Sequence, residues 1–229
     1  FNLNWLQLSP VTSGILSNGS YKLLNRASGL AVTAVHASNF VNAATYTSTS
    51  AQQWNLQPIG GGEYTITSAA NGLSLVSGSG FYFWNNNHYL IQPAYDGCYR
   101  IVPTTSGNCF ETTVNDPTAI DAQVSAGSEN QQWAILSPTA LAFPTGLSAV
   151  ASGSTAADLT WNAVSGATSY NIKRATNSGG DYATIATGIT TTNYTDAGLM
   201  AGMKYFYVVS AVMGGMESLN STEAQLPYP

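Results

Sequence analysis

Apolar and polar residues alternate along most of this chain, and glycine, proline or asparagine interrupts the alternation every few positions. In a segment such as Tyr64-Thr-Ile66, residues two positions apart point to the same face of a strand. The first 137 residues contain no window with a sustained apolar period of 3.6, which an amphipathic helix requires. The pattern therefore predicts an all-β fold of short strands joined by tight turns.

A strand-turn-strand segment recurs three times in the first part of the chain. Its openings read Gly19-Ser-Tyr-Lys-Leu23, Gly62-Glu-Tyr-Thr-Ile66 and Gly97-Cys-Tyr-Arg-Ile101. Eight residues after each tyrosine stands a second glycine, at Gly29, Gly72 and Gly107. We expect each opening to form a hairpin in which this second glycine takes the positive φ of a tight turn. A second apolar strand then follows, at Val32, Leu75 and Phe110.

Each repeat closes on a motif with an aromatic residue at its centre. The closings read Gln52-Gln-Trp-Asn-Leu-Gln-Pro58, Asn87-His-Tyr-Leu-Ile-Gln-Pro93 and Gln131-Gln-Trp-Ala-Ile-Leu-Ser-Pro138. The shared aromatic is Trp54, Tyr89 or Trp133, and an apolar residue follows it two places later, so we expect all three rings to be buried and structural. Three strand-rich copies, each with one buried ring, predict a small barrel with pseudo-threefold symmetry.

The Gln-x-Trp closings in three tandem copies resemble those of the ricin-type β-trefoil lectins and the bacterial trefoil carbohydrate-binding modules. The resemblance covers residues 14–137. It implies a β-trefoil domain that binds sugar.

The sequence pattern of the chain changes after Pro144. Alternating strands separated by turns every 8 to 12 positions predict an immunoglobulin-like β-sandwich. Leu199, Gly202 and Tyr205 have the spacing of a tyrosine corner, in which the phenol hydroxyl bonds to an upstream backbone group. Residues 144–229 resemble a fibronectin type III domain, with Trp161 in its core. Residues 138–143 form a short linker with a proline on each side, which predicts a semi-rigid connection and a spacer role for the second domain.

The first residues allow two interpretations. Phe1-Asn-Leu-Asn-Trp5 resembles the last strand of the jelly-roll carbohydrate-binding modules of secreted polysaccharide-degrading enzymes. In that case residues 1–13 are the tail of a preceding module, and the chain is a C-terminal piece of a larger protein. Alternatively, Trp5-Leu-Gln-Leu-Ser-Pro10 is similar in sequence to the closing motif of the third repeat and adds an edge strand to the barrel.

Composition indicates an extracellular protein. Charged residues make up 7% of the chain, against ~25% in typical globular domains, and the net charge is −5. The basic residues are scattered, so no stripe of positive charge is available to bind nucleic acid. No apolar run is long enough for insertion in a membrane. The sequence gives no reason to expect a cofactor or a metal site.

Cys98 and Cys109 are the two cysteines of the chain. They lie at facing positions on the two predicted strands of the third opening hairpin, and an even pair in a secreted protein usually forms a disulfide. We therefore expect a bridge across this hairpin, with two thiols as the alternative.

A sugar site needs an aromatic face for the pyranose ring and polar side chains for its hydroxyls. Trp84 is the one tryptophan for which the two folds have no structural use, and it lies beside Asn85-Asn86-Asn87-His88. We predict a site at Trp84 with Tyr82, Asn86 and His88. The alternative is that Trp84 caps the barrel.

The family resemblance points to a second site in the third repeat. The position of the family's sugar-binding aspartate is occupied by Thr33, Val76 and Glu111 in the three repeats, so the third alone keeps an acid. The family's asparagine before the closing motif is Ala51 in the first repeat and Asn130 in the third. The stacking position holds Ala44, which Tyr46 can replace, and Gln123. We predict a secondary site at Glu111 with Asp121 and Asn130.

These observations predict a noncatalytic carbohydrate-binding domain with a fibronectin type III spacer, belonging to a secreted, multimodular, polysaccharide-active protein. Its partners are a polysaccharide or glycan and the upstream modules of the same polypeptide. The main alternative is an extracellular structural or adhesive protein whose trefoil has lost sugar binding. A weaker one is a glycosidase using Glu111 and Asp121, because that reaction needs two carboxyl groups ~5 to 9.5 Å apart.

Overall fold

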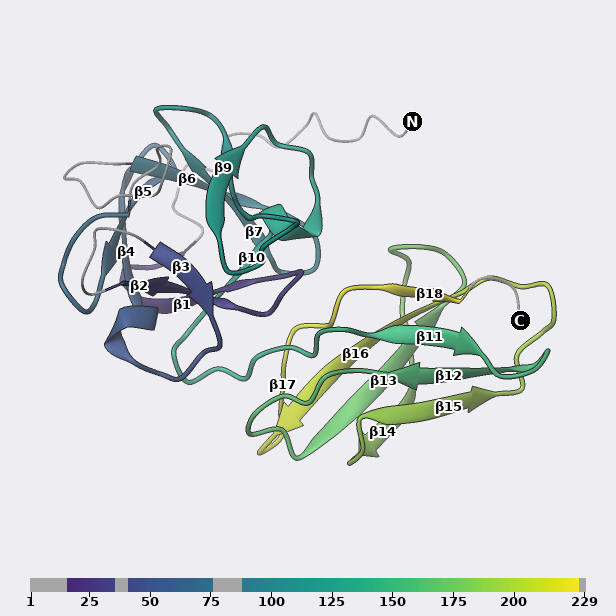
Figure 1. The fold of residues 1–229 in the computed structure, drawn as a ribbon. Coiled ribbons are helices and arrows are strands. Elements are labelled where there is room, and N and C mark those ends of the chain that lie inside the picture. Colours follow the sequence, from purple (N-terminus) through teal and green to yellow (C-terminus); the bar gives the residue numbers. More distant parts are fainter. Residues whose placement is uncertain (1–15, 36–40, 76–87, 227–229) are drawn as a thin grey trace. The chain divides into compact units, whose positions relative to one another are not determined.

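The computed structural model describes residues 16–35, 41–75 and 88–226, and Figure 1 shows their course. Apart from the short turn Arg26–Gly29, residues up to Pro138 form one compact unit, and residues from Thr139 on form a second. The predicted tail or edge strand within residues 1–13 lies outside the described residues.

The first unit is built on a closed ring of strands. The ring strands are β1 (Gly19–Asn25), β4 (Trp54–Gly60), β5 (Glu63–Ser68), β6 (His88–Pro93), β7 (Tyr99–Pro103) and β10 (Trp133–Leu136). Neighbours in this order pair antiparallel, and β10 returns to pair with β1. Because each repeat contributes a first and a last strand, threefold repetition of one segment closes the barrel without leaving an edge.

Hairpin strands outside the ring complete the described repeats. In the first repeat β2 (Ala31–Ala34) pairs with β3 (Val41–Ala44), and in the third β8 (Cys109–Thr112) pairs with β9 (Ile120–Gln123). Short 3₁₀ turns, η1 (Ser50–Gln52) and η2 (Glu129–Gln131), lead into the closing strands.

The glycines of the three opening turns take the predicted conformation. Their φ angles are 71° at Gly29, 71° at Gly72 and 70° at Gly107, a region that favours glycine because it has no Cβ. The sequence prediction of three turns of one kind is confirmed.

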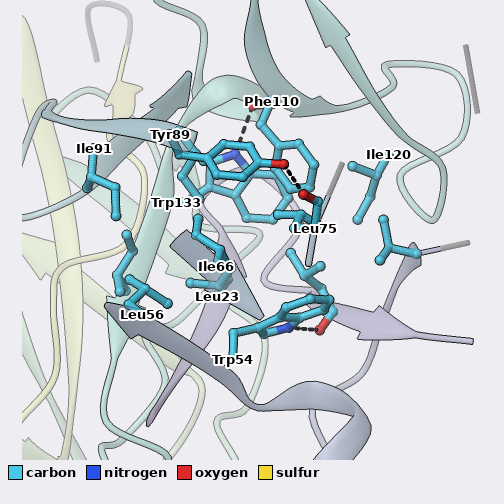
Figure 2. Packing of buried hydrophobic residues seen from close by; sticks show 14 of the residues in the cluster. Leu23, Trp54, Leu56, Ile66, Leu75, Tyr89, Ile91, Phe110, Ile120 and Trp133 are labelled. Carbon is cyan, nitrogen blue, oxygen red and sulfur yellow. Dashed lines mark hydrogen bonds between the residues drawn. The ribbon is translucent and has the colours of Figure 1, made fainter. Parts of the chain in front are cut away.

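The closing aromatics form the centre of the barrel, as predicted. Trp54, Tyr89 and Trp133 are each 0% exposed. Figure 2 shows their rings with Leu23, Ile66 and other aliphatic residues of the core. Each donates a hydrogen bond to a backbone carbonyl that follows the opening turn of its own repeat: Trp54 Nε1 to Val32 O at 2.9 Å, Trp133 Nε1 to Phe110 O at 2.9 Å, and the Tyr89 hydroxyl to Leu75 O.

The second unit is a sandwich of two antiparallel sheets. One sheet has the order β11 (Ser148–Ala151), β12 (Ala156–Thr160), β15 (Asn193–Ala197). The other contains β14 (Ala183–Ile189), β13 (Ser169–Ala175), β16 (Tyr205–Met213), β17 (Met216–Glu217) and β18 (Ala224–Leu226). This arrangement confirms the predicted β-sandwich.

The buried tryptophan and the tyrosine corner of the sandwich also match the sequence prediction. Trp161 is 5% exposed and packs edge-on against Tyr170, with ring centroids 5.4 Å apart. The Tyr205 hydroxyl accepts a hydrogen bond from the Met200 amide at 3.0 Å, which is the predicted tyrosine corner.

The predicted disulfide is not formed. Cys98 and Cys109 are both buried thiols in the structure. The turn between them closes where the Gly107 amide bonds to Pro103 O, so Cys98 lies five residues before the turn and Cys109 two residues after it. An offset of three residues along a hairpin corresponds to roughly 10 Å, beyond the ~7 Å between Cα atoms that a disulfide spans. The prediction failed because it assumed that the two cysteines face each other across the hairpin, whereas the position of the turn offsets them along it.

Candidate functional site

The β8–β9 hairpin of the third repeat brings together two of the predicted site residues. Glu111 of β8 and Asp121 of β9 are direct cross-strand partners. On such a pair the two side chains leave the same face of the hairpin, with Cβ atoms ~4.5 to 5.5 Å apart. Both residues are half-buried, so their carboxylates are partly open to solvent.

Both carboxylates accept hydrogen bonds from amide groups. Glu111 Oε2 accepts from Gln131 Nε2 at 2.9 Å. Asp121 accepts from the Ala122 amide at 2.8 Å and from Gln123 Nε2 at 2.8 Å. Each carboxylate oxygen has two lone pairs, so these bonds orient the pair and leave acceptor capacity for hydroxyl donors.

Gln131 is the centre of this arrangement and is 1% exposed. Its Oε1 accepts from the amides of Ala126 and Gly127 at 2.8 and 3.2 Å. Its Nε2 donates to Val124 O at 2.9 Å as well as to Glu111. The closing glutamine thus folds the β9–η2 loop against the hairpin and fixes the carboxylate at the same time.

Asn130, the third predicted residue, lies beside Gln131 in η2. Its Nδ2 donates to Thr112 O at 2.9 Å, on the residue that follows Glu111. Asn130 therefore holds η2 against β8 at the site.

The electrostatics of the hairpin are acidic. No ion pair joins Glu111 or Asp121 to a basic residue in the described part of the chain. In the β8–β9 turn, hydrogen bonds from the Thr118 hydroxyl and amide hold the pKa of Asp116 below its ordinary value. Like charges placed directly opposite each other destabilise a sheet, so this pair is not there for stability.

The first repeat has the same framework without the acid. Gln52 Nε2 donates to Thr33 Oγ1 at 3.1 Å and to Thr45 O at 2.8 Å, as Gln131 does to Glu111 and Val124. Tyr46 is half-buried, its hydroxyl donates to Pro138 O at 3.1 Å, and Lys22 Nζ lies 4.5 Å from its ring centroid. This ammonium covers one face of the ring that was considered for stacking in this repeat.

In the second repeat, Tyr82, Trp84 and Asn86 lie outside the described residues, and His88 alone of the predicted site is described. His88 begins β6, and its Nδ1 lies 3.0 Å from Glu63 Oε2 on β5. The His88 side chain is 43% exposed, which leaves it open to solvent at the edge of this repeat.

Sequence reasoning missed two contributors to the third-repeat site. Gln123 was assigned to a stacking position, but it donates to Asp121 two residues earlier on the same face of β9. Gln131 was not among the predicted site residues, and it bonds to backbone groups and to Glu111. The available signal for Gln123 was its spacing of two residues from Asp121, which places both side chains on one face of a strand.

The described ranges 16–35, 41–75 and 88–226 contain no group of three or more His, Cys, Asp or Glu residues arranged to hold a metal ion. Nor do they contain a helix with the length and apolarity needed to cross a bilayer.

Comparison with known proteins assigns a family to each unit. Residues 7–80 match the family described as ricin-type beta-trefoil lectin domain-like, and residues 142–225 match the fibronectin type III domain. A solved Fn3-like protein from Clostridium thermocellum is 65% identical, over 40% of this chain and 96% of its own, with a TM-score of 0.38.

Two curated relatives are similar over shorter stretches. An amylopullulanase from Thermoanaerobacter thermohydrosulfuricus is 46% identical over 79 residues, which is 34% of this chain and 5% of that protein. A poly(3-hydroxybutyrate) depolymerase from Ralstonia pickettii is 45% identical over 69 residues, 30% of this chain and 13% of that protein.

The chain therefore spans a small fraction of the curated relatives that it matches, as expected of a noncatalytic accessory region. It consists of a ricin-type β-trefoil lectin-like domain followed by a fibronectin type III domain.

Proposed function

We propose that the trefoil domain binds a neutral polysaccharide without catalysis, and that the fibronectin type III domain is its spacer within a secreted, multimodular, polysaccharide-active enzyme. The observation that carries this proposal is the cross-strand pair of Glu111 and Asp121, oriented by amide donors in the lectin-like domain. Paired carboxylates accept hydrogen bonds from adjacent sugar hydroxyls.

The charge of the site favours a neutral ligand. Glu111 and Asp121 have no basic partner among the described residues, and the whole chain has a net charge of −5. A polymer of uronic acids would bring further negative charge against both carboxylates, at a cost that low salt would increase.

The third repeat has little surface for stacking. Gln123 occupies the stacking position, and Val124, which is 77% exposed, supplies an apolar side chain next to it. A site of this kind binds a monosaccharide at about millimolar strength, near −4 kcal/mol. A second site at Trp84, with Tyr82, Asn86 and His88, would supply the aromatic face, and two weak sites on one polymer raise the effective affinity.

The relatives support an accessory role. One relative is named an amylopullulanase and another a poly(3-hydroxybutyrate) depolymerase. Segments similar to parts of this chain therefore occur in enzymes of different named activity. Matches to short parts of enzymes with different named activities favour attachment or spacing over bond cleavage. The structural or adhesive alternative makes the opposite prediction, which is that the intact chain binds no glycan.

Affinity electrophoresis tests the proposal. The chain is run in native gels containing pullulan, galactan or xylan, and in matched gels containing polygalacturonate. We expect retardation by at least one neutral polymer and none by polygalacturonate. Glu111→Gln should reduce the retardation. The addition of Trp84→Ala to this variant should abolish the remaining retardation. Unchanged mobility of the wild type in every neutral gel would favour the structural or adhesive protein.

A further inference from the structure

We infer that Asn25, a buried residue of the first repeat, is a positioning residue for the sugar site of the third repeat. This inference rests on the proposed function. It assigns a role to a side chain on β1, the strand that closes the barrel against β10.

Three hydrogen bonds form a closed network around Asn25. Its Nδ2 donates to Asn130 O at 2.8 Å, and its Oδ1 accepts from the Thr112 hydroxyl at 3.2 Å. The third side of the network is the bond from Asn130 Nδ2 to Thr112 O at 2.9 Å. Asn25 is 0% exposed and Thr112 is 2% exposed, so the network is shielded from water.

The network reaches the acidic pair through sequence neighbours. Thr112 follows Glu111 on β8, and Asn130 precedes Gln131, whose amide donates to Glu111. Asn25 therefore ties together the strand that carries the carboxylate and the turn that carries its hydrogen-bond donor. Fixing both elements in one buried polar network restricts the carboxylate to one position.

At each of the other two junctions between repeats, the sequence lacks at least one side chain that this network needs. The residues equivalent to Asn25 are Ser68 and Pro103, four positions after the opening tyrosine. At the junction of the second repeat with the first, Ser68 meets a repeat that has Ala34 and Ala51 in place of Thr112 and Asn130, and alanine side chains carry no donor or acceptor. Pro103 has no polar side chain. The network and the acid thus coincide in the third repeat.

The stability of a buried network does not by itself require a binding site, so the test must separate folding from binding. Thr112→Val keeps the shape of threonine and removes the hydroxyl, whereas Thr112→Ser keeps the hydroxyl. Asn25→Leu removes both polar groups of Asn25. Ser68→Ala is the matched control, because it perturbs an equally buried position at the junction of the second repeat with the first.

Dissociation constants for pullulan, galactan and xylan are measured by affinity electrophoresis, alongside thermal unfolding of each variant. We expect Asn25→Leu and Thr112→Val to weaken binding about tenfold at temperatures where both are folded, the loss of about one well-formed hydrogen bond. Thr112→Ser and Ser68→Ala should bind within about twofold of wild type. In a Glu111→Gln background, Asn25→Leu should weaken binding no further, because a positioning residue acts through the group that it positions.

The possible failures are distinguishable. Suppose that Glu111→Gln weakens binding but that neither Asn25→Leu nor Thr112→Val changes it. This result overturns the positioning role and leaves the proposed function standing. An Asn25→Leu variant that does not fold leaves Thr112→Val to decide. A wild type that binds none of the three polymers overturns the role and the proposed function together.

Discussion

Opposed carboxylates are the residue-level feature that separates the third repeat from the first. Glu111 faces Asp121 across β8 and β9, whereas Thr33 occupies the equivalent position in the first repeat. Both repeats keep the closing glutamine with the same hydrogen-bond geometry. The framework is therefore common to both, and the acid is the specific addition.

Neutralising one member of this pair should leave the fold intact or strengthen it. Glu111→Gln removes the like-charge repulsion and keeps a side-chain oxygen for Gln131, so we expect the free energy of unfolding to rise by about 0.2 to 1 kcal/mol. Urea unfolding of the variant measures it, with Thr33→Val as a control at the uncharged position. A loss of more than 1 kcal/mol would mean that Glu111 is structural.

Cysteine chemistry gives a second test at this scale. Cys98 and Cys109 are 2% and 1% exposed, so we expect neither thiol to react with iodoacetamide in the folded protein. After denaturation without reductant, mass spectrometry should detect two alkyl adducts. An unreduced protein that takes up none would restore the disulfide that the sequence predicted.

At the scale of elements, the barrel depends on the closing aromatics and their hydrogen bonds to the backbone that follows the opening turn of each repeat. Trp133 is fully buried, contacts the Phe110 ring at a centroid distance of 5.0 Å, and donates to Phe110 O. We expect Trp133→Ala to lower the free energy of unfolding by roughly 3 to 5 kcal/mol. Trp133→Phe, which loses the donor and keeps a ring, should cost less. A Trp133→Ala protein with unchanged urea midpoint would contradict this assignment.

The β8–β9 hairpin should also be sensitive to acid. The pKa of Asp116 is lowered from 3.8 by the Thr118 hydroxyl and amide, so its carboxylate stabilises the turn above that pH. This contribution is lost as the pH falls through the lower pKa of the folded state. We expect the urea midpoint of the trefoil to fall over this window, and Asp116→Asn to flatten the dependence.

A comparable group in the other domain provides the control. The Thr195 and Ser152 hydroxyls lower the pKa of Asp158, so the same argument applies to the sandwich. Asp158→Asn should flatten the acid dependence of the sandwich and leave that of the trefoil unchanged. If neither variant changes the pH dependence of the urea midpoint, that dependence arises from other titratable groups.

Local patterns predicted the elements well, because their causes are local. The turn glycines, the buried closing rings and the tyrosine corner follow from residue type and short spacing. The disulfide prediction failed because facing positions depend on where a hairpin turn closes. The Asn25 network was not predicted, since it joins residues 105 and 87 positions apart, and no local pattern signals such a contact.

For the whole molecule, we expect the trefoil to bind the polysaccharide and the fibronectin type III domain to act as a spacer. The two domains belong to different families and have separate cores. We therefore expect a fragment of residues 1–138 to retain the monosaccharide affinity of the intact chain. Isothermal titration of both proteins with the sugar unit of the retained polymer measures this. A fragment that is folded by circular dichroism but binds more than about tenfold weaker would give the second domain a direct role.

The most direct measurement is a ¹H–¹⁵N correlation spectrum of the intact 24.0 kDa chain, titrated with an oligosaccharide of the polymer that retards it in gels. We expect progressive shifts for the amides of Glu111, Asp121 and Gln123, for the side-chain amide of Asn130 and for the Trp84 indole. Amides of residues 144–226 should remain unshifted. Shifts confined to that second domain, or none at saturating sugar, would contradict sugar binding by the trefoil.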